Sequence, residues 1–104
     1  PEVAELCNFA RRTATALVVG AIERAGATLY CSALQIGDTG ELTGCHRKLV
    51  PTAAERLVWG QGDGHTLPTL KTRAGIAGSA VCWENYMPEL RQALHAKGVT
   101  LWCA

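Results

Sequence analysis

Apolar and polar positions along the chain repeat with two different periods, which predicts both helices and strands. Over residues 2–14, apolar side chains recur every three or four positions with charged residues opposite, and this spacing predicts an amphipathic helix. Residues 16–23 and 28–36 are short apolar runs with β-branched side chains, which are typical of buried strands. The residues between these runs include Gly26, which tolerates a positive φ, so a tight turn is predicted there.

The middle of the chain has weaker periodicity and stronger turn signals. The sequence GDTG at 37–40 is a hairpin signal before ELTG, and it indicates that the strands here pair antiparallel. Residues 45–66 show no steady period, but Thr52 can cap a short helix with Glu55 in the capping-box position. The sequence GQGDG that follows is expected to be a loop. It neither opens a helix nor ends in lysine and serine, so it does not predict a phosphate-binding loop.

The last third of the chain predicts two strands, a helix and the start of another strand. Residues 66–72 and 75–82 flank a turn and have strand-like composition. Residues 87–97 predict a helix with Pro88 in its first turn and Gly98 as its stop, and VTLWCA then begins as a strand. Buried strands with amphipathic helices at both ends of the chain predict a layered α/β fold.

Composition and charge narrow the possible partners. The 104 residues suffice for one small domain or for part of a larger one, and 48% hydrophobic with 18% charged residues is typical of a globular protein. The net charge is +1 and the basic residues are scattered, while the longest apolar run is too short to span a membrane. We therefore expect neither a nucleic acid nor a membrane as partner.

The cysteine and histidine positions argue against two further kinds of site. The five cysteines are odd in number, spread along the chain and without CxxC pairs, so neither a disulfide framework nor a structural zinc site is predicted. The three histidines show no metal-ligand spacing. We therefore expect no metal, no cofactor and a reducing, cytoplasmic location.

Cys82 has two possible roles when only its neighbours are considered. It closes an apolar run and is followed at once by polar residues and Pro88, so it is either a buried core thiol or a nucleophile, and the core role is the commoner. Lys48 by itself fits a solvated lysine in a basic patch. Glu55 fits a cap for its own helix or an ion-pair partner of Arg56.

Two long motifs favour catalytic roles for these residues over the structural ones. With HRKLVPTAAERLVWGQGDG at 46–64 and GSAVCWENYMP at 78–88, the chain resembles the nitrilases of the carbon–nitrogen hydrolase superfamily over nearly all of its length. The resemblance implies a four-layer α-β-β-α sandwich. Because the chain begins at Pro1 without an initiator methionine and stops as a strand begins, we expect residues 1–104 to be the central portion of one such domain, with its N- and C-terminal parts absent.

The resemblance also implies a role for each candidate residue. Cys82 matches the nucleophile, Lys48 matches the catalytic lysine, and Glu55 matches a further glutamate found in many members. The general-base glutamate of the family is expected upstream of Pro1. Glu84 matches an acidic position next to the nucleophile, where orienting the turn is the expected role. A thiolate suits the weakly electrophilic nitrile carbon, and a compact cation can stabilise the charge that develops on nitrogen.

The resemblance therefore predicts an enzyme that converts an organic nitrile and water into a carboxylic acid and ammonia through a thioimidate and a thioester. A cyanide hydratase, which stops at the amide, and an amidase-type hydrolase are enzyme alternatives. A truncated, non-catalytic assembly module is an alternative of another class. We expect the complete protein, called the parent enzyme below, to form homo-oligomers, and this chain by itself to be inactive.

Overall fold

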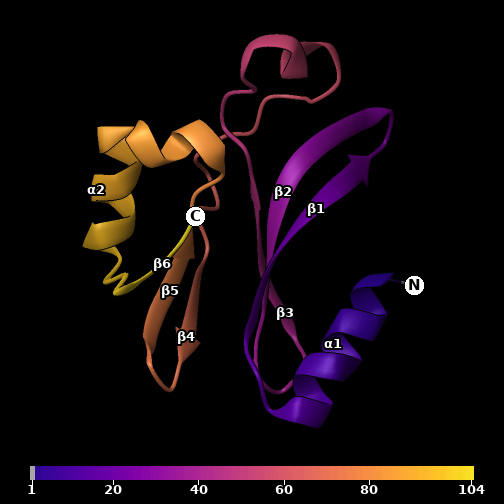
Figure 1. The fold of residues 1–104 in the computed structure, drawn as a ribbon, viewed down its shortest axis with the longest axis vertical. Helices are drawn as coiled ribbons and strands as arrows, with labels where there is room; N and C mark the ends of the chain where they lie inside the picture. The colour runs from indigo at the N-terminus through magenta and orange to yellow at the C-terminus, as the bar shows by residue number, and fades with distance from the viewer. Residues whose placement is uncertain (1) are drawn as a thin grey trace.

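The computed structural model describes residues 2–104 and arranges them in layers (Figure 1). The elements in chain order are α1 (Glu2–Thr13), β1 (Leu17–Ala25), β2 (Thr28–Ile36), β3 (Leu42–Arg47), the 3₁₀ helix η1 (Ala53–Leu57), β4 (Thr69–Thr72), β5 (Gly75–Ser79), the 3₁₀ helix η2 (Cys82–Tyr86), α2 (Pro88–Ala96) and β6 (Leu101–Cys103). One sheet has the order β1-β2-β3 and the other the order β4-β5-β6. Helix α1 lies against the first sheet and α2 against the second, which confirms the predicted α-β-β-α arrangement of an incomplete sandwich.

The first sheet is built on a long antiparallel hairpin. Strands β1 and β2 pair along their whole lengths, starting with Leu17 opposite Ile36, and the turn contains Gly26 with a φ of 61°. Strand β1 ends at Ala25, beyond the predicted range of 16–23, because the tight turn leaves only two residues unpaired.

Strand β3 joins this hairpin on the β2 edge, and the turn at 37–40 that precedes it is the one that GDTG predicts. The assignment of residues 45–47 to an irregular stretch is wrong, because they continue β3 as far as Arg47. The sequence hides this because CHR has no apolar alternation. Side chains on both faces of the strand contact polar partners here, so no alternation of apolar and polar residues marks it. The strand is formed by backbone pairing with β2, which does not depend on the side chains.

The second sheet joins a hairpin to a parallel strand. Strands β4 and β5 turn at Gly75, whose φ is 143°, and β6 lies parallel to β5 with Leu101 opposite Ala77. A parallel pair needs a long crossover, which η2 and α2 supply. One expectation changes, because β5 ends at Ser79 instead of running to Cys82, while the terminal strand β6 is paired with β5 along one edge.

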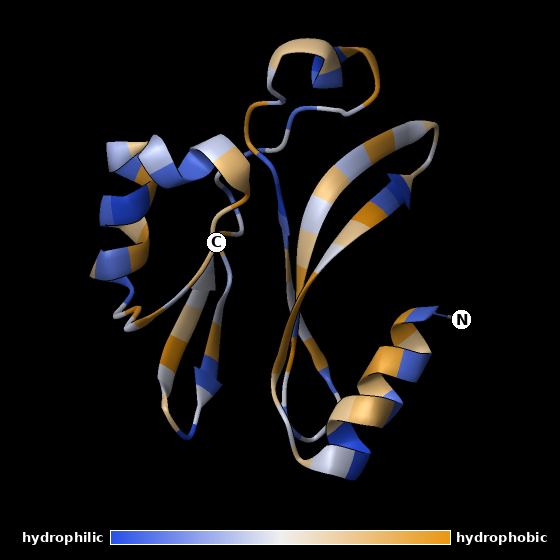
Figure 2. Ribbon diagram, in the orientation of Figure 1, coloured by the Kyte–Doolittle hydropathy of each residue, from blue (hydrophilic) through white to orange (hydrophobic). Residues whose placement is uncertain are grey.

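A buried apolar cluster lies under α2. Leu90 and Leu94 of the helix are 3% and 1% exposed, and they pack with Leu67, Ala80 and Val99. Figure 2 shows that the apolar side of α2 faces the second sheet, as its periodicity predicts. No helix within residues 2–104 is long and apolar enough to cross a membrane.

A polar link holds the two sheets together near the site described next. The side-chain amide of Gln35, on β2, is fully buried. It donates hydrogen bonds to the carbonyl of Pro68 at 3.0 Å and to the hydroxyl of Ser79 at 3.4 Å. These bonds fix the end of β5, from which the chain turns to Cys82, against the sheet that carries Lys48.

Candidate active site

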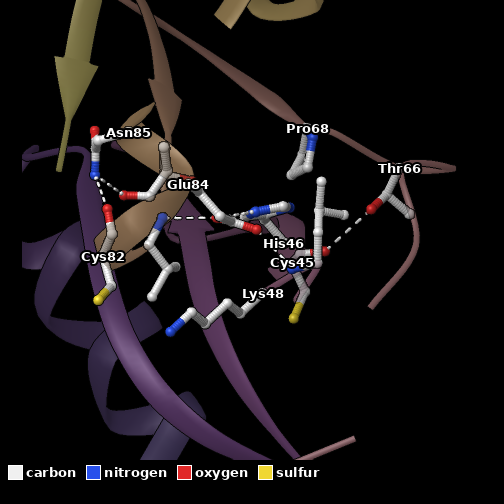
Figure 3. A network of polar contacts seen from close by, with 12 residues as sticks. Cys45, His46, Lys48, Thr66, Pro68, Cys82, Glu84 and Asn85 are labelled. Carbon is white, nitrogen blue, oxygen red and sulfur yellow. Dashed lines mark hydrogen bonds and ion pairs between the residues drawn. The ribbon is translucent and has the colours of Figure 1, made fainter. Parts of the chain in front are cut away.

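Cys82 is held out at a sharp turn. It is exposed, it is the first residue of η2, and its φ of 59° lies in the left-handed region that costs a non-glycine residue about 1 kcal/mol or more. The side chain of Asn85 secures the turn by donating to the carbonyls of Cys82 at 2.7 Å and Ala80 at 3.2 Å (Figure 3). Its own oxygen accepts the indole N–H of Trp102 at 2.7 Å. A strained, sharply turned position that exposes the side chain is typical of a nucleophile.

The helix that follows Cys82 differs from the expected one. The pattern at 87–97 predicts one helix after Cys82, with Pro88 in its first turn. Instead Cys82 begins the five-residue η2, and α2 starts separately at Pro88. The longer helix therefore does not directly follow Cys82.

The segment His46-Arg47-Lys48 sends its side chains to opposite faces of the first sheet, because side chains alternate along a strand. Arg47 bonds the carboxylate of Glu23 at 2.9 and 2.5 Å, and its guanidinium lies 4.0 Å from the centre of the Tyr30 ring. His46 and Lys48 lie on the other face and are 1% and 2% exposed. Neither the reading of this segment as a basic patch nor that of Lys48 as a solvated lysine is correct.

Lys48 is a buried cation with an ion-pair partner. Its ammonium donates to Glu55 at 2.5 Å and to the hydroxyl of Thr52 at 3.2 Å. Burial opposes the charged form, but the hydrogen bond to Glu55 and the charge of the Cys82 thiolate outweigh it and raise the pKa of Lys48. Lys48 is therefore protonated near neutral pH, which suits it to stabilise negative charge and not to act as a base.

Glu55 serves both its own helix and Lys48. Its carboxylate accepts the backbone N–H of Thr52 at 2.7 Å, which confirms its expected capping position, while Arg56 bonds instead to the carbonyl of Pro51. The hydrogen bond from Lys48, helped by that backbone N–H, lowers the pKa of Glu55. An ionised carboxylate with a lowered pKa is a weak proton acceptor, so the contacts favour an ion-pair role.

The backbone of Lys48 is fixed from both sides. Its N–H donates to the carbonyl of Cys31 at 2.7 Å, and its carbonyl accepts the N–H of Gly62 at 2.9 Å. A Cβ atom at Gly62 would lie only 2.7 Å from that carbonyl oxygen, so the GQGDG loop needs glycine here in order to approach Lys48. The glycine-rich loop therefore supports the site by its close packing, as expected of a loop without phosphate-binding features.

The structure brings the three predicted residues together. Figure 3 shows the Lys48 ammonium and the Cys82 sulfur directed into the same region, and an ionised Cys82 is among the groups that raise the pKa of Lys48. A second thiol, Cys31 on β2, is half-buried, and burial raises its pKa. The exposed Cys82 is thus better placed to react than its neighbour Cys31.

Glu84 links the two segments that carry Lys48 and Cys82. It is 2% exposed, and its carboxylate accepts the backbone N–H groups of Leu49 at 2.5 Å and Val81 at 2.7 Å. The same carboxylate lies 2.8 Å from Nε2 of His46. Burial raises its pKa, but these three hydrogen bonds outweigh burial and lower the pKa of Glu84.

His46 is the contributor to the site that sequence reasoning missed. The motif that predicts Lys48 also contains His46, and the two-residue spacing places both on the same strand face. That signal was hidden because residues 45–47 were not recognised as a strand. The partner of His46, Glu84, comes from a motif 38 positions further on, and no spacing rule predicts the contact.

A cavity of about 640 Å³ opens beside Cys82 and gives solvent access to the thiol. Its other lining residues are Asn85, Tyr86, Arg91, His95, Trp102 and Ala104. Within residues 2–104, no group of three or more histidine, cysteine or acidic side chains is arranged to hold a metal ion.

Comparison with known proteins confirms the resemblance. The family model that describes carbon–nitrogen hydrolases matches residues 1–104. Nitrilase 1 of Arabidopsis thaliana is 54% identical over all 104 residues, which make up 30% of that protein. The bifunctional nitrilase/nitrile hydratase NIT4A of Lupinus angustifolius is 53% identical over the same length, again 30% of that protein. The chain thus spans about a third of the length of these relatives.

Solved structures with lower sequence identity share the fold. A carbon–nitrogen hydrolase from Helicobacter pylori G27 superimposes with a TM-score of 0.83 and 23% identity, over 97% of this chain and 36% of that one. An amidase from Nesterenkonia sp. gives a TM-score of 0.81 and 22% identity, over 96% of this chain and 38% of that one. At these identities the likeness shows the fold, and it supports the assignment of the layers to one larger sandwich.

Proposed function

Because this chain belongs to the carbon–nitrogen hydrolase family, we propose that it forms the central part of a nitrilase that converts an organic nitrile into a carboxylic acid and ammonia. The observation that carries the proposal is the exposed, left-handed Cys82 beside a buried lysine whose pKa is raised. An exposed thiol next to a fixed cation suits attack on a carbon whose nitrogen becomes negatively charged. The plant nitrilases, at 50–54% identity, support the nitrile as substrate class.

The proposed reaction consumes two water molecules. The Cys82 thiolate attacks the nitrile carbon, and the nitrogen takes up a proton while Lys48 stabilises its charge, which gives a thioimidate. The first water adds to the thioimidate carbon, and loss of ammonia leaves a thioester. The second water adds to the thioester, and loss of the thiolate gives the carboxylic acid and restores Cys82.

The two glutamates have different parts in this proposal. The carboxylate that takes the thiol proton and activates water is proposed to lie in the parent enzyme upstream of this chain. Glu55 is proposed to keep Lys48 charged and oriented, because its own carboxylate is engaged by Lys48 and Thr52 and its pKa is lowered. A base needs a pKa closer to the working pH, so Glu55 suits the supporting role better.

Nitrile hydration is a second candidate activity. Five of the plant relatives, such as NIT4A of Lupinus angustifolius, are named bifunctional nitrilase/nitrile hydratases. Both products follow from one intermediate, because the tetrahedral adduct of thioimidate and water can expel either ammonia or the thiolate. Loss of ammonia leads to the acid, whereas loss of the Cys82 thiolate releases an amide.

The decisive experiment measures the products of the parent enzyme from aliphatic, aromatic and arylacetonitriles. Release of ammonia and acid, with a covalent acyl adduct on the peptide that carries Cys82, is the expected result. Amide without ammonia would assign a hydratase, and hydrolysis of simple amides without nitrile consumption would assign an amidase. No turnover of either substrate class would favour the non-catalytic assembly module.

Two properties of the parent enzyme remain proposals. All five cysteines are free thiols, which supports a reducing compartment such as the cytoplasm. Homo-oligomerisation rests on the family resemblance. The partners that we propose are a small nitrile and water.

A further inference from the structure

We propose that Glu84 is a positioning residue that sets the separation between Lys48 and Cys82, with His46 as its anchor. Leu49 directly follows Lys48, and Val81 directly precedes Cys82. The Glu84 carboxylate accepts the N–H groups of both neighbours, at 2.5 and 2.7 Å, so one buried side chain ties the two reactive segments together (Figure 3). This inference rests on the proposed function, because it assigns Glu84 a part in that reaction.

The chemistry of the contacts indicates why a carboxylate is needed there. A buried charge is costly, and an apolar side chain of similar size would fill the same space without that cost. Only an acceptor with two oxygens can hold two amides of separate segments while also accepting a third donor. Hydrogen bonds to an ionised carboxylate are also about twice as strong as neutral ones, and therefore restrict movement more.

His46 completes the set of donors to Glu84. Its Nε2 lies 2.8 Å from the carboxylate, while its buried Nδ1 has no hydrogen-bond partner among residues 2–104. The tautomer with hydrogen on Nε2 fits this environment, since it donates to Glu84 and leaves only a lone pair unmatched. His46 thereby fixes the orientation of the carboxylate from the β3 side.

Glu84 is poorly suited to act directly on substrate. It is 2% exposed, and three donors already occupy its two oxygens. Its place in the site is therefore to hold other groups. Cys82 needs such support because its left-handed backbone is strained. The hydrogen bonds of Asn85 go to Ala80, Cys82 and Trp102, and these residues all lie on the Cys82 side of the site. Of the two side chains Asn85 and Glu84, it is Glu84 that bonds to the segment carrying Lys48, through the N–H of Leu49.

A positioning role predicts a large effect from a small displacement. Misplacing a reacting group by about 1 Å can cost about 100-fold in rate. In Glu84→Gln the amide retains one acceptor oxygen, so its NH₂ group would face the Leu49 N–H in one orientation, or both the Val81 N–H and Nε2 of His46 in the other. We expect kcat of the parent enzyme to fall by about 10- to 100-fold with a much smaller change in KM. Glu89→Gln, the same change at an exposed position of α2, is the control and should leave both constants unchanged.

The clearest test compares two alkylating reagents and does not need turnover. Iodoacetate is anionic and iodoacetamide is neutral, so a nearby Lys48 ammonium favours the reaction of Cys82 with iodoacetate. The ratio of the two alkylation rates at Cys82, followed by mass spectrometry, therefore reports how close Lys48 is. We expect Glu84→Gln to shift the ratio toward that of Lys48→Ala, and Glu89→Gln to retain the ratio of the unmodified protein.

The outcomes separate this inference from the proposed function. A folded Glu84→Gln with an unchanged ratio would show that Glu84 does not position Lys48, whether or not nitriles are hydrolysed. A shifted ratio in a protein that hydrolyses no nitrile would retain the positioning role and reject the nitrilase proposal. When kcat is measured, Glu84→Gln should lower it little further in a protein that already carries Lys48→Ala. A purely structural role of Glu84 would instead make the two losses of kcat additive in free energy.

A second pair of variants covers the case in which Glu84→Gln fails to fold. His46→Leu removes the anchor but leaves both backbone amides on Glu84, and we expect a smaller shift of the alkylation ratio in the same direction. His46→Gln restores an N–H donor and should return the ratio toward that of the unmodified protein. Equal ratios in these two variants would contradict the anchoring role of His46.

Discussion

The ammonium of Lys48 lies 2.5 Å from a carboxylate oxygen of Glu55, and the two partners differ sharply in exposure. The lysine side chain is 2% exposed and the glutamate side chain is 36% exposed. The cation is thus fixed inside the fold while its counter-ion faces partly outward. The hydrogen bond to Glu55 helps to keep Lys48 charged. The Lys48 ammonium and the Cys82 sulfur are directed into the same region (Figure 3).

Cys82→Ser should abolish turnover in the parent enzyme. A hydroxyl keeps the shape of the thiol but is a much weaker nucleophile, so we expect activity to fall by about three orders of magnitude or more. Initial rates of ammonia release measure the effect. Cys31→Ser, at the half-buried thiol nearby, is the matched control and should stay active. Retention of more than a few per cent of the rate in Cys82→Ser would exclude Cys82 as nucleophile.

Lys48→Ala should reduce kcat by about 100- to 1,000-fold, since it removes the cation that we propose to stabilise charge on the reacting nitrogen. Lys48→Arg should recover little activity, because a wide planar guanidinium does not fit the closely packed contacts to Glu55 and Thr52. Steady-state kinetics with a matched melting curve separates the rate effect from unfolding. Lys71→Ala, on the exposed side of β4, supplies the control. Near-normal kcat in Lys48→Ala would remove the lysine from the mechanism.

Glu55→Gln should narrow the activity profile on its alkaline side. The Glu55 hydrogen bond and charge help to raise the pKa of Lys48, so a neutral side chain lets that pKa fall. Lys48 would then lose its proton at a lower pH, and the alkaline limb of kcat should move toward neutral pH. The measurement is the pH dependence of kcat beside that of Glu89→Gln. An alkaline limb that does not move would show that Glu55 leaves the charge of Lys48 unchanged.

Local patterns predicted most of the fold. The hairpin signals at 26 and 37–40, the amphipathic spacing of α1 and α2, and Pro88 and Gly98 at the ends of α2 all correspond to observed features. These features are predictable because each depends on the conformational preferences of a few adjacent residues. The end of β5 was misplaced because Ala80, Val81 and Cys82 continue the apolar run of a strand, while the backbone already turns.

The site was only partly predictable for a different reason. The family motifs point to Lys48, Glu55 and Cys82, but residue spacing says nothing about which side chains meet across the two sheets. The pairing of His46 with Glu84, and the reach of Glu84 to Leu49, depend on how β3 packs beside the turn at Val81. Such contacts follow from tertiary packing and were found only in the structure.

The ion pair between Glu23 and Arg47 should contribute acid-dependent stability to the parent enzyme. The Glu23 carboxylate accepts two N–H groups of Arg47, the hydroxyl of Ser32 at 2.8 Å and the thiol of Cys45 at 3.4 Å. The hydrogen bonds from Arg47 are the largest cause, and together these contacts lower the pKa of Glu23 from 4.5 to about 2. A lowered pKa in the folded state means that the unfolded state binds the proton first as the pH falls.

The stabilisation should therefore be complete above about pH 4.5 and should disappear as the pH falls to about 2. We expect the urea midpoint of Glu23→Gln to lie below that of the unmodified protein near neutral pH, and the gap to close across this window. Solvent screens the pair, since the Arg47 side chain is 38% exposed, so the gap should be smaller than the full pKa shift implies and should shrink with added salt. Glu89→Gln measures the effect of losing one exposed carboxylate. A gap that stays constant down to pH 2 would show that the ionisation of Glu23 is not what stabilises the fold.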